Sequence, residues 1–345
     1  MKKALQYILP VILSVLLIWY LFRKVDFRQT MEIISHGVDY WWILAAMGIS
    51  IFSHIFRAMR WRIQLNALHV KTTLMELTCG VFGCYALNLL LPRVGELWRC
   101  TFVARRSRAQ FTTVMGSMVA DRMADSVMVL LLILLTFVIA APALASFMAK
   151  YPVGENILNI LYSPTLWIAG IIAIGIVCWI LRRFRDSTPV AKLRKWIGEI
   201  WNGFAITVTM PGKWKFLMLT LAIWGCYFVQ LYVAFYAFSF TRALCHEHGL
   251  GFGLLPCLVA FVFSSIGMAV PSNGGLGPWN IAIMFGLAIY GVADVEGAAF
   301  SILQWSGQTV MLIILGIFTA IWIGATSSSN SIQHKTGLSN EIRRR

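Results

Sequence analysis

Charge is scarce in this chain. Only 12% of its 345 residues are charged, whereas 59% are hydrophobic, and the mean hydropathy is +0.75. Soluble domains carry about 25% charged residues, so this composition excludes an ordinary water-soluble protein. Apolar runs long enough to cross the hydrocarbon layer of a bilayer, which is about 30 Å thick, recur along the whole length. The sequence therefore predicts a polytopic, all-α membrane protein.

Signatures of several other protein classes are also missing. The seven cysteines are scattered and form no CxxC pair, which indicates neither a disulfide framework nor a metal site. The stretch CHEH at 245–248 has metal-ligand residue types without the spacing of a known site. No nucleotide-binding loop occurs, so any drive for transport would come from an ion gradient, the membrane potential or downhill exchange. We expect no cofactor and no metal.

Positive charge, by contrast, is in excess. There are 29 Lys and Arg against 14 Asp and Glu, for a net charge of +15. In a soluble protein this excess would suggest nucleic acid, but here the basic residues lie in loops between apolar runs, where they mark topology and meet anionic lipid headgroups. We therefore expect no nucleic-acid partner. The positive-inside rule places the basic clusters in the cytoplasm; they lie at 57–71, 105–108, 182–215 and in the C-terminal EIRRR.

The number of membrane crossings follows from these loops. Nine simple crossings would place the two termini on opposite sides, which contradicts the basic clusters. The conflict disappears if 73–91 dips in from the cytoplasm, turns at Pro92 and Gly95 and returns through 96–104, while the run before PSNGGLGP dips in from outside. Six full spans plus two re-entrant helix pairs remain, with both termini cytoplasmic. The nine apolar runs are 5–22, 40–58, 73–91, 112–140, 165–181, 216–240, 254–270, 278–292 and 300–323.

This count predicts an inverted repeat. Each half contains span, span, re-entrant pair and span, and the second half starts from the opposite side. The turns LPRVGEL (91–97) and VPSNGGL (270–276) share Pro, Gly and Leu at the same offsets. We expect one transmembrane domain over 1–324, with halves at about 1–140 and 165–324, and a disordered cytoplasmic tail at 325–345. Positions 106 and 188 are then cytoplasmic and position 150 is external.

Charge at the first turn has two interpretations. Arg93, Glu96 and Arg99 would lie on a polar hairpin tip inside the bilayer, where each charge costs about 2.5 to 3.5 kcal/mol and is by default functional. Alternatively, the hairpin barely enters, and Arg93 and Arg99 are ordinary interfacial anchors.

A second polar group follows on the next span. Asp121 and Asp125 are four residues apart and share a helix face. They lie either at membrane depth, where pairing with Arg93 would hold them, or on a solvated flank. In the last span Gln304 and Gln308, also four apart, are either the uncharged counterpart of this pair or helix-packing contacts.

The second turn supplies polar groups without charge. Consecutive glycine amides can form an anion-binding nest, although any tight turn also requires such glycines. The candidate residues of this turn are Ser272, Asn273, Gly274, Gly275 and Asn280.

Three short motifs occur in a fixed order along the chain. The residues are Asn88, Pro92, Arg93, Gly95, Glu96 and Arg99; Asp121, Arg122 and Asp125; and Pro271, Gly274, Gly275, Leu276 and Gly277. In them the chain resembles the flippase-like membrane proteins related to the transmembrane region of lysylphosphatidylglycerol synthases. That family usually has Pro at the place of Asn273 and Glu at the place of Asn280, so a proton- or cation-linked role of that Glu does not carry over. The resemblance implies a lipid-translocating domain of a bacterial or archaeal cytoplasmic membrane.

Three functions fit these observations. In the leading hypothesis the chain is not an enzyme and binds or moves an anionic lipid: Arg93 and Arg122 engage the headgroup, and Glu96, Asp121 and Asp125 balance these arginines. The second is a membrane transferase acting on a lipid carrier, with the two aspartates as its only candidate carboxylate pair. The third is a non-transporting partner of other membrane enzymes, such as a lipid-modifying enzyme.

Overall fold

The computed structural model describes residues 26–150 and 209–342, apart from residues 92 and 271, together with four isolated positions between these ranges. Within this part the chain is helical, and extended backbone pairs only at an isolated bridge between Val38 and Phe238. The predicted all-α class is confirmed. The predicted spans 5–22 and 165–181 lie outside the described residues.

The described helices follow the predicted apolar runs. Four are long and apolar enough to cross a membrane, namely α3, α6, α11 and the Asp294–Thr326 part of α15, whereas α4 and α13 are shorter. The total of six spans remains a prediction. In chain order the elements are α2 (Phe27–His36), α3 (Tyr40–Ala67), α4 (Leu74–Leu90), α5 (Val94–Ser107), α6 (Phe111–Ile139), α7 (Ala141–Lys150), α11 (Lys213–Phe235), α12 (Ser239–His246), α13 (Leu254–Gly267), the 3-10 turn η1 (Asn273–Gly275), α14 (Pro278–Ala288) and α15 (Asp294–Ile342).

Local sequence sets where several of these helices begin and end. At the start of α4, Thr73 and Glu76 form a capping box, in which each side chain accepts a hydrogen bond from the other's backbone N–H. The helix stops at Leu90, because a residue before proline, here Leu91, is disfavoured in helical geometry. Pro278 opens α14, at a position where its missing N–H costs nothing.

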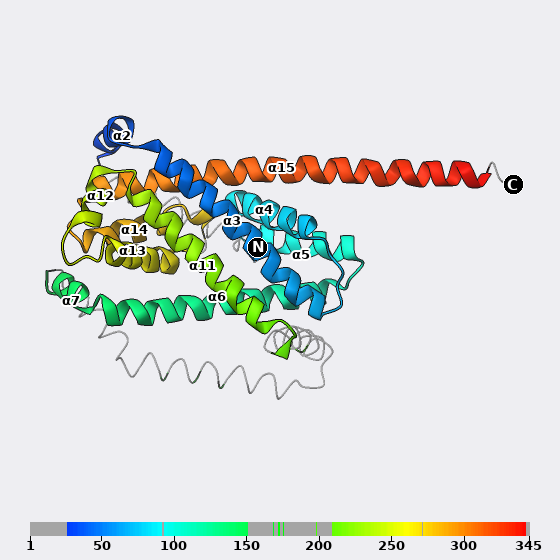
Figure 1. Ribbon diagram of the computed structural model, residues 1–345, viewed down its shortest axis with the longest axis horizontal. Helices are drawn as coiled ribbons and strands as arrows, with labels where there is room; N and C mark the ends of the chain where they lie inside the picture. Colours follow the sequence, from blue (N-terminus) through cyan, green and yellow to red (C-terminus); the bar gives the residue numbers. More distant parts are fainter. Residues whose placement is uncertain are drawn as a thin grey trace.

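Two helical hairpins approach each other from opposite ends of the molecule (Figure 1). One is formed by α4 and α5, and the other by α13 and α14 with η1 at its turn. Their tips are in contact, since the Asn273 side chain donates a hydrogen bond to the Leu90 carbonyl oxygen at 3.0 Å. These are the two pairs that the sequence predicts to be re-entrant; their depth in a membrane remains a prediction.

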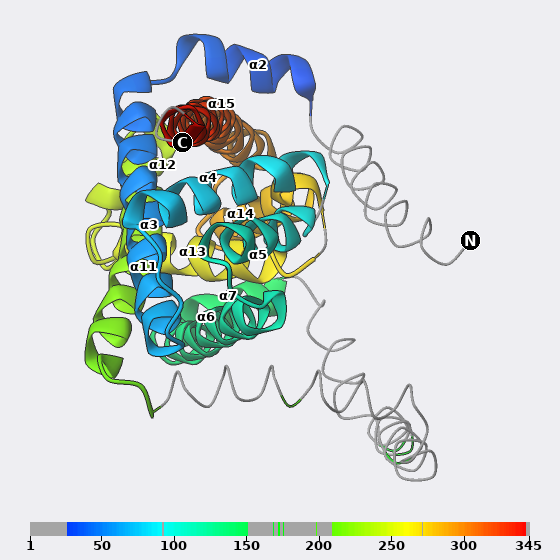
Figure 2. The ribbon, with the colours of Figure 1, turned by 90° about the vertical axis from the view of Figure 1, so that its right-hand side faces the viewer.

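The helix contacts of the first half recur between the corresponding helices of the second half. In the first half α4 packs on α15, and in the second half the corresponding α13 packs on α6. Likewise α5 packs on α6 and α14 on α15, while α3 and α11 pack on each other. In the end-on view the hairpins lie between α15 and α6, and α3 and α11 both run along one side of them (Figure 2). This arrangement supports the predicted inverted repeat.

The loops divide between two ends of the molecule. At one end, which we call the basic end, are the C-terminus of α3, the α5–α6 turn and the start of α11 (Figure 1). Arg106 there contacts Glu76 at 3.7 Å and Thr326 at 2.5 Å. At the other end the Asp39 N–H donates to the Ala237 carbonyl oxygen. The side of the membrane that each end faces remains a prediction.

The last helix, α15, extends beyond the predicted end of the transmembrane domain at residue 324. The sequence predicts a disordered tail from residue 325, whereas α15 continues as a helix to Ile342. Thr326 is held at the start of this segment, because its hydroxyl donates back to the carbonyl of Trp322 and accepts from Arg106. The domain boundary at 324 and the disordered tail that follows it remain predictions.

The turn of the first hairpin requires glycine at position 95. A Cβ there would lie 1.9 Å from the Cys84 carbonyl oxygen, and the Gly95 N–H donates to the Asn88 side chain at 2.9 Å. We expect Gly95→Ala to destabilise the protein by about 2 to 3 kcal/mol, because α5 must move away from α4. Gly48→Ala is the control, since a Cβ at this helical glycine meets nothing within 4 Å. Thermal unfolding in detergent measures both, and equal effects would refute the close-approach argument.

Candidate functional site

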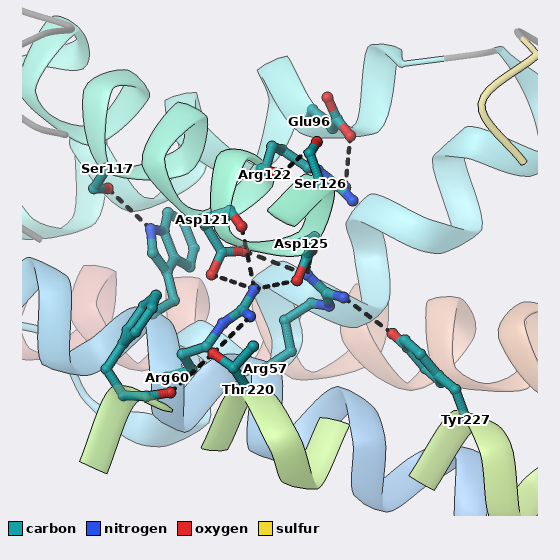
Figure 3. A network of polar contacts seen from close by, with 12 residues as sticks. Arg57, Arg60, Glu96, Ser117, Asp121, Arg122, Asp125, Ser126, Thr220 and Tyr227 are labelled. Carbon is teal, nitrogen blue, oxygen red and sulfur yellow. Dashed lines mark hydrogen bonds and ion pairs between the residues drawn. The ribbon is translucent and has the colours of Figure 1, made fainter. Parts of the chain in front are cut away.

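Two arginines of α3 and two aspartates of α6 form a buried ion cluster (Figure 3). Arg57 Nη1 lies 2.7 Å from Asp125 Oδ2 and 3.4 Å from Asp121 Oδ2. Arg60 Nη2 lies 2.6 Å from Asp121 Oδ1 and 2.9 Å from Asp125 Oδ1. All four residues are buried, so this cluster fixes the rotation of α3 against α6.

Neighbouring groups of α11 complete the cluster. Arg57 Nη2 donates to the Tyr227 hydroxyl at 3.1 Å, and Arg60 Nη1 donates to the Thr220 hydroxyl at 3.2 Å. The Arg60 guanidinium also stacks over the Phe216 ring, 5.3 Å from its centroid. Because these hydrogen bonds and contacts satisfy much of the donor capacity of the two arginines, we interpret the cluster as structural.

Arg57 and Arg60 were not predicted to lie at the site. The sequence places them in a basic cluster of a cytoplasmic loop, whereas α3 continues to Ala67 and buries both. A signal was present: they belong to a polar stripe at helical spacing along one face of α3. The buried polar residues of that stripe are Ser50, Ser53, His54, Arg57, Arg60 and Gln64.

Asp121 is not on a solvated flank, because its side chain is 0% exposed. The expected balance between acidic and basic groups is also arranged differently. Asp121 and Asp125 pair with Arg57 and Arg60, and no ion pair among the described residues joins either aspartate to Arg93.

Glu96 pairs with Arg122, as the leading hypothesis requires. The Arg122 Nη2 to Glu96 Oε1 distance is 2.5 Å, and the bridge ties α6 to α5 (Figure 3). The Arg122 side chain is 34% exposed, so it remains accessible from one side. The Glu96 side chain is 22% exposed, so the pair as a whole is partly buried.

Arg93 lies at the tip of the first hairpin. It is the N-cap residue of α5, its φ is +65°, and its side chain is exposed. In the part of the chain that the structure describes, it makes no hydrogen bond or ion pair. A left-handed conformation is uncommon for a residue other than glycine, so the turn holds this cation in a costly backbone geometry.

Arg99 is the most unusual charged residue of the site. It is 0% exposed, and its Nε, Nη1 and Nη2 atoms have no hydrogen-bond partner within the described residues. One face of its guanidinium stacks over the Trp61 ring, 4.3 Å from the centroid, and Trp61 in turn donates to the Ser117 hydroxyl. An unpaired buried cation is unfavourable by several kcal/mol. Its surroundings therefore suit an anion that supplies the missing acceptors.

The second hairpin uses its polar groups within the turn. Asn273 bonds Leu90, the Gly274 carbonyl accepts from Trp305 Nε1 at 2.9 Å, and Asn280 caps the Gly277 N–H. Gly274 and Gly275 have φ of +58° and +83°, which explains glycine at both positions. The Ser272 hydroxyl donates to the carbonyl oxygen of Val270 at 3.4 Å. These roles support the turn interpretation, and the anion-binding nest remains a prediction.

The remaining predicted residues stabilise the packing of the hairpins and spans. Gln308 exchanges hydrogen bonds with Ser50 and accepts one from Gln230, which joins α15, α3 and α11. Gln304 is buried, and its Oε1 atom has no partner in the described chain. Asn88 holds the Gly95 amide, so its contact is with the hairpin turn. No group of three or more His, Cys, Asp or Glu residues in the described part could hold a metal ion.

Four long apolar helices and two helical hairpins define an all-α integral membrane protein. The chain belongs to the family described as the lysylphosphatidylglycerol synthase transmembrane region, whose pattern matches residues 7–316. A UPF0104 membrane protein of Pyrococcus horikoshii is 27% identical over 144 residues, which cover 41% of this chain and 42% of that protein. The match therefore spans less than half of either chain. No solved structure matches.

Proposed function

We propose that this protein binds a lipid with an anionic, phosphate-bearing headgroup and moves it between leaflets. The observation that carries the proposal is Arg99, a buried guanidinium without a hydrogen-bond partner in the described chain. Its five N–H donors match the several oxygens of a phosphate better than any single neutral acceptor. Trp61 stacks on one face of the guanidinium, and the three nitrogens that lack a hydrogen-bond partner among the described residues are the donors that such an anion would use.

The other two arginines provide a route to Arg99. Arg93 is exposed at the hairpin tip, and Arg122 is partly exposed in its bridge to Glu96. Arg99 and Glu96 lie on the same helix, so a headgroup that displaces Glu96 from Arg122 is one turn of α5 away from Arg99. We infer that the headgroup passes from the exposed cations to the buried one.

Movement across the membrane requires the two hairpin tips to separate. The described hydrogen bond between the tips, from the Asn273 side chain to the Leu90 carbonyl oxygen, is uncharged. A hydrogen bond of this kind contributes about 1 kcal/mol, so no ion pair among the described residues has to break when the tips separate. The ion cluster of α3 and α6 holds the scaffold meanwhile.

The transferase alternative receives little support from the site geometry. A lipid-carrier transferase needs carboxylates that are free to bind a metal or accept a proton. Both carboxylates of the candidate pair are engaged by two arginines each, within 3.4 Å. The non-transporting partner role remains the second candidate, because the same hydrogen bonds would also hold a rigid scaffold. In either role the protein acts in a bacterial or archaeal cytoplasmic membrane, with both termini cytoplasmic.

Transport is tested in vesicles that contain the purified full chain. We expect labelled phosphatidylglycerol to exchange between leaflets at least about tenfold faster than in protein-free vesicles, and labelled phosphatidylcholine to exchange more slowly than phosphatidylglycerol. Headgroup charge is the reason, since a zwitterionic headgroup brings no net charge to Arg99. Equal rates with and without protein for a panel of anionic phospholipids would favour the partner role.

A further inference from the structure

A second cationic feature lies on α5, away from Arg99. A hollow of about 620 Å³ opens at the α5–α6 turn. It is lined by Thr101, Ala104, Arg105, Arg108, Ala109 and Phe111. Arg99 lies on the buried face of α5, whereas Arg105 and Arg108 are exposed. The hollow is therefore outside the buried site.

The two arginines that line the hollow are available for a ligand. Arg106, between them, is held by Glu76 and Thr326 and stacks over Phe102 and Trp322. Among the described residues, Arg105 and Arg108 take part in no such pair, and no acidic residue lines the hollow. Of these three arginines, Arg106 therefore has a structural role, whereas Arg105 and Arg108 both line the hollow.

The lining is amphipathic. Ala104, Ala109 and Phe111 supply apolar surface, and the guanidinium groups of Arg105 and Arg108 supply positive charge. An inorganic phosphate ion would match the charge and gain nothing from the apolar surface. A phospholipid matches both, because its headgroup can meet the arginines while its glycerol and first methylenes cover the apolar side chains.

We propose that the hollow is a surface binding site for one anionic phospholipid of the leaflet at the basic end. The site is separate from the proposed headgroup site at Arg99 and does not depend on it. Two arginines near a membrane surface contribute enough to concentrate an anionic lipid there. A lipid held in this way lies beside α5, the helix that carries both Arg99 and Glu96.

The test counts bound lipid on the full chain in neutral detergent. Phosphatidylglycerol is titrated into the Arg99→Met variant, so that a lipid in the buried site does not contribute, and bound lipid is counted by native mass spectrometry. Adding Arg105→Glu and Arg108→Glu should weaken the remaining binding on the order of thirtyfold or more. The matched control is Arg62→Glu with Lys71→Glu, two exposed residues at the same end that do not line the hollow. It changes the net charge equally and should leave binding within about twofold.

Two further measurements identify the ligand. Phe111→Ala should weaken phosphatidylglycerol binding severalfold, and inorganic phosphate at millimolar concentration should not displace the lipid. Equal losses in the Arg105/Arg108 and Arg62/Lys71 variants would show a non-specific charge effect and overturn the proposal. Displacement by inorganic phosphate would overturn the assignment to a lipid. Because all four changed residues are exposed, the thermal unfolding of both variants should match that of the Arg99→Met parent.

Discussion

Arg99→Met should abolish retention of the anionic lipid in the buried site while leaving the protein at least as stable as the wild type. Methionine has a similar length and no charge, so the change removes an unpaired buried cation and keeps the packing on Trp61. Replacing buried charged groups by hydrophobic residues of similar volume is often neutral or stabilising. Binding energy and folding energy are thus expected to change in opposite directions.

The size of the binding effect follows from burial. Truncating one partner of a buried, charge-assisted contact costs about 2 to 5 kcal/mol, equivalent to a loss of roughly thirtyfold or more in affinity. Arg99→Lys should retain part of the binding, because the charge remains and the planar donor fork is lost. Native mass spectrometry of gently purified protein measures the retained lipid, and thermal unfolding in detergent measures stability.

Arg62→Met provides the control for the Arg99 experiment. Arg62 is an exposed arginine of α3 at the basic end, so its replacement removes the same charge without touching the buried site. If Arg99→Met and the wild type retain the same lipid in the same amount, Arg99 is not a headgroup site. If Arg99→Met unfolds at a much lower temperature, its guanidinium has a structural partner and the proposal loses the observation that carries it.

Asp121→Asn should destabilise the protein strongly, by about 3 to 5 kcal/mol. Asp121 is fully buried and pairs with both Arg57 and Arg60, so the change leaves two buried guanidinium groups to share Asp125. Asp39→Asn is the control, because its pair with Arg242 is more than 40% exposed on both sides and 3.7 Å long. A pair of that kind contributes at most about 1 kcal/mol.

Replacing one aspartate and one arginine of the ion cluster together distinguishes a structural role of the cluster from a role in lipid binding. The double variant Asp121→Leu with Arg60→Met should recover much of the stability lost in Asp121→Asn, because neither change then leaves a buried charge without its counterion. Its lipid retention should remain near that of the wild type, since Arg99 is unchanged. Loss of lipid with restored stability would assign the ion cluster to the binding site and overturn its structural interpretation.

Much of the fold follows from local sequence. The runs 40–58, 112–140, 216–240 and 300–323 correspond to the long helices α3, α6, α11 and α15. Apolar length and helix-breaking prolines and glycines are properties of neighbouring residues, so they can be read without knowing the fold. The two turns with Pro and Gly at shared offsets also predicted the hairpins that the structure shows.

The ion-pair partners of the charged residues could not be predicted from local sequence. Asp121 and Asp125 were identified as a pair on one helix face, but Arg57 and Arg60 were interpreted as topology markers. Helical spacing places residues on a face, and it does not say which face of which helix lies opposite. The expected arrangement, in which these aspartates balance Arg93 and Arg122, is therefore not the one observed.

The sequence by itself determined a helical membrane protein with broken segments in both halves and charge beside the first of them, because apolar length, proline, glycine and charge act locally. Only the tertiary structure decided that α3 supplies the counterions of α6, that the hairpin tips touch, and that Arg99 is buried without a partner in the described chain. These outcomes depend on how helices distant in sequence rotate and cross. Packing of whole surfaces sets that geometry, and no single segment contains it.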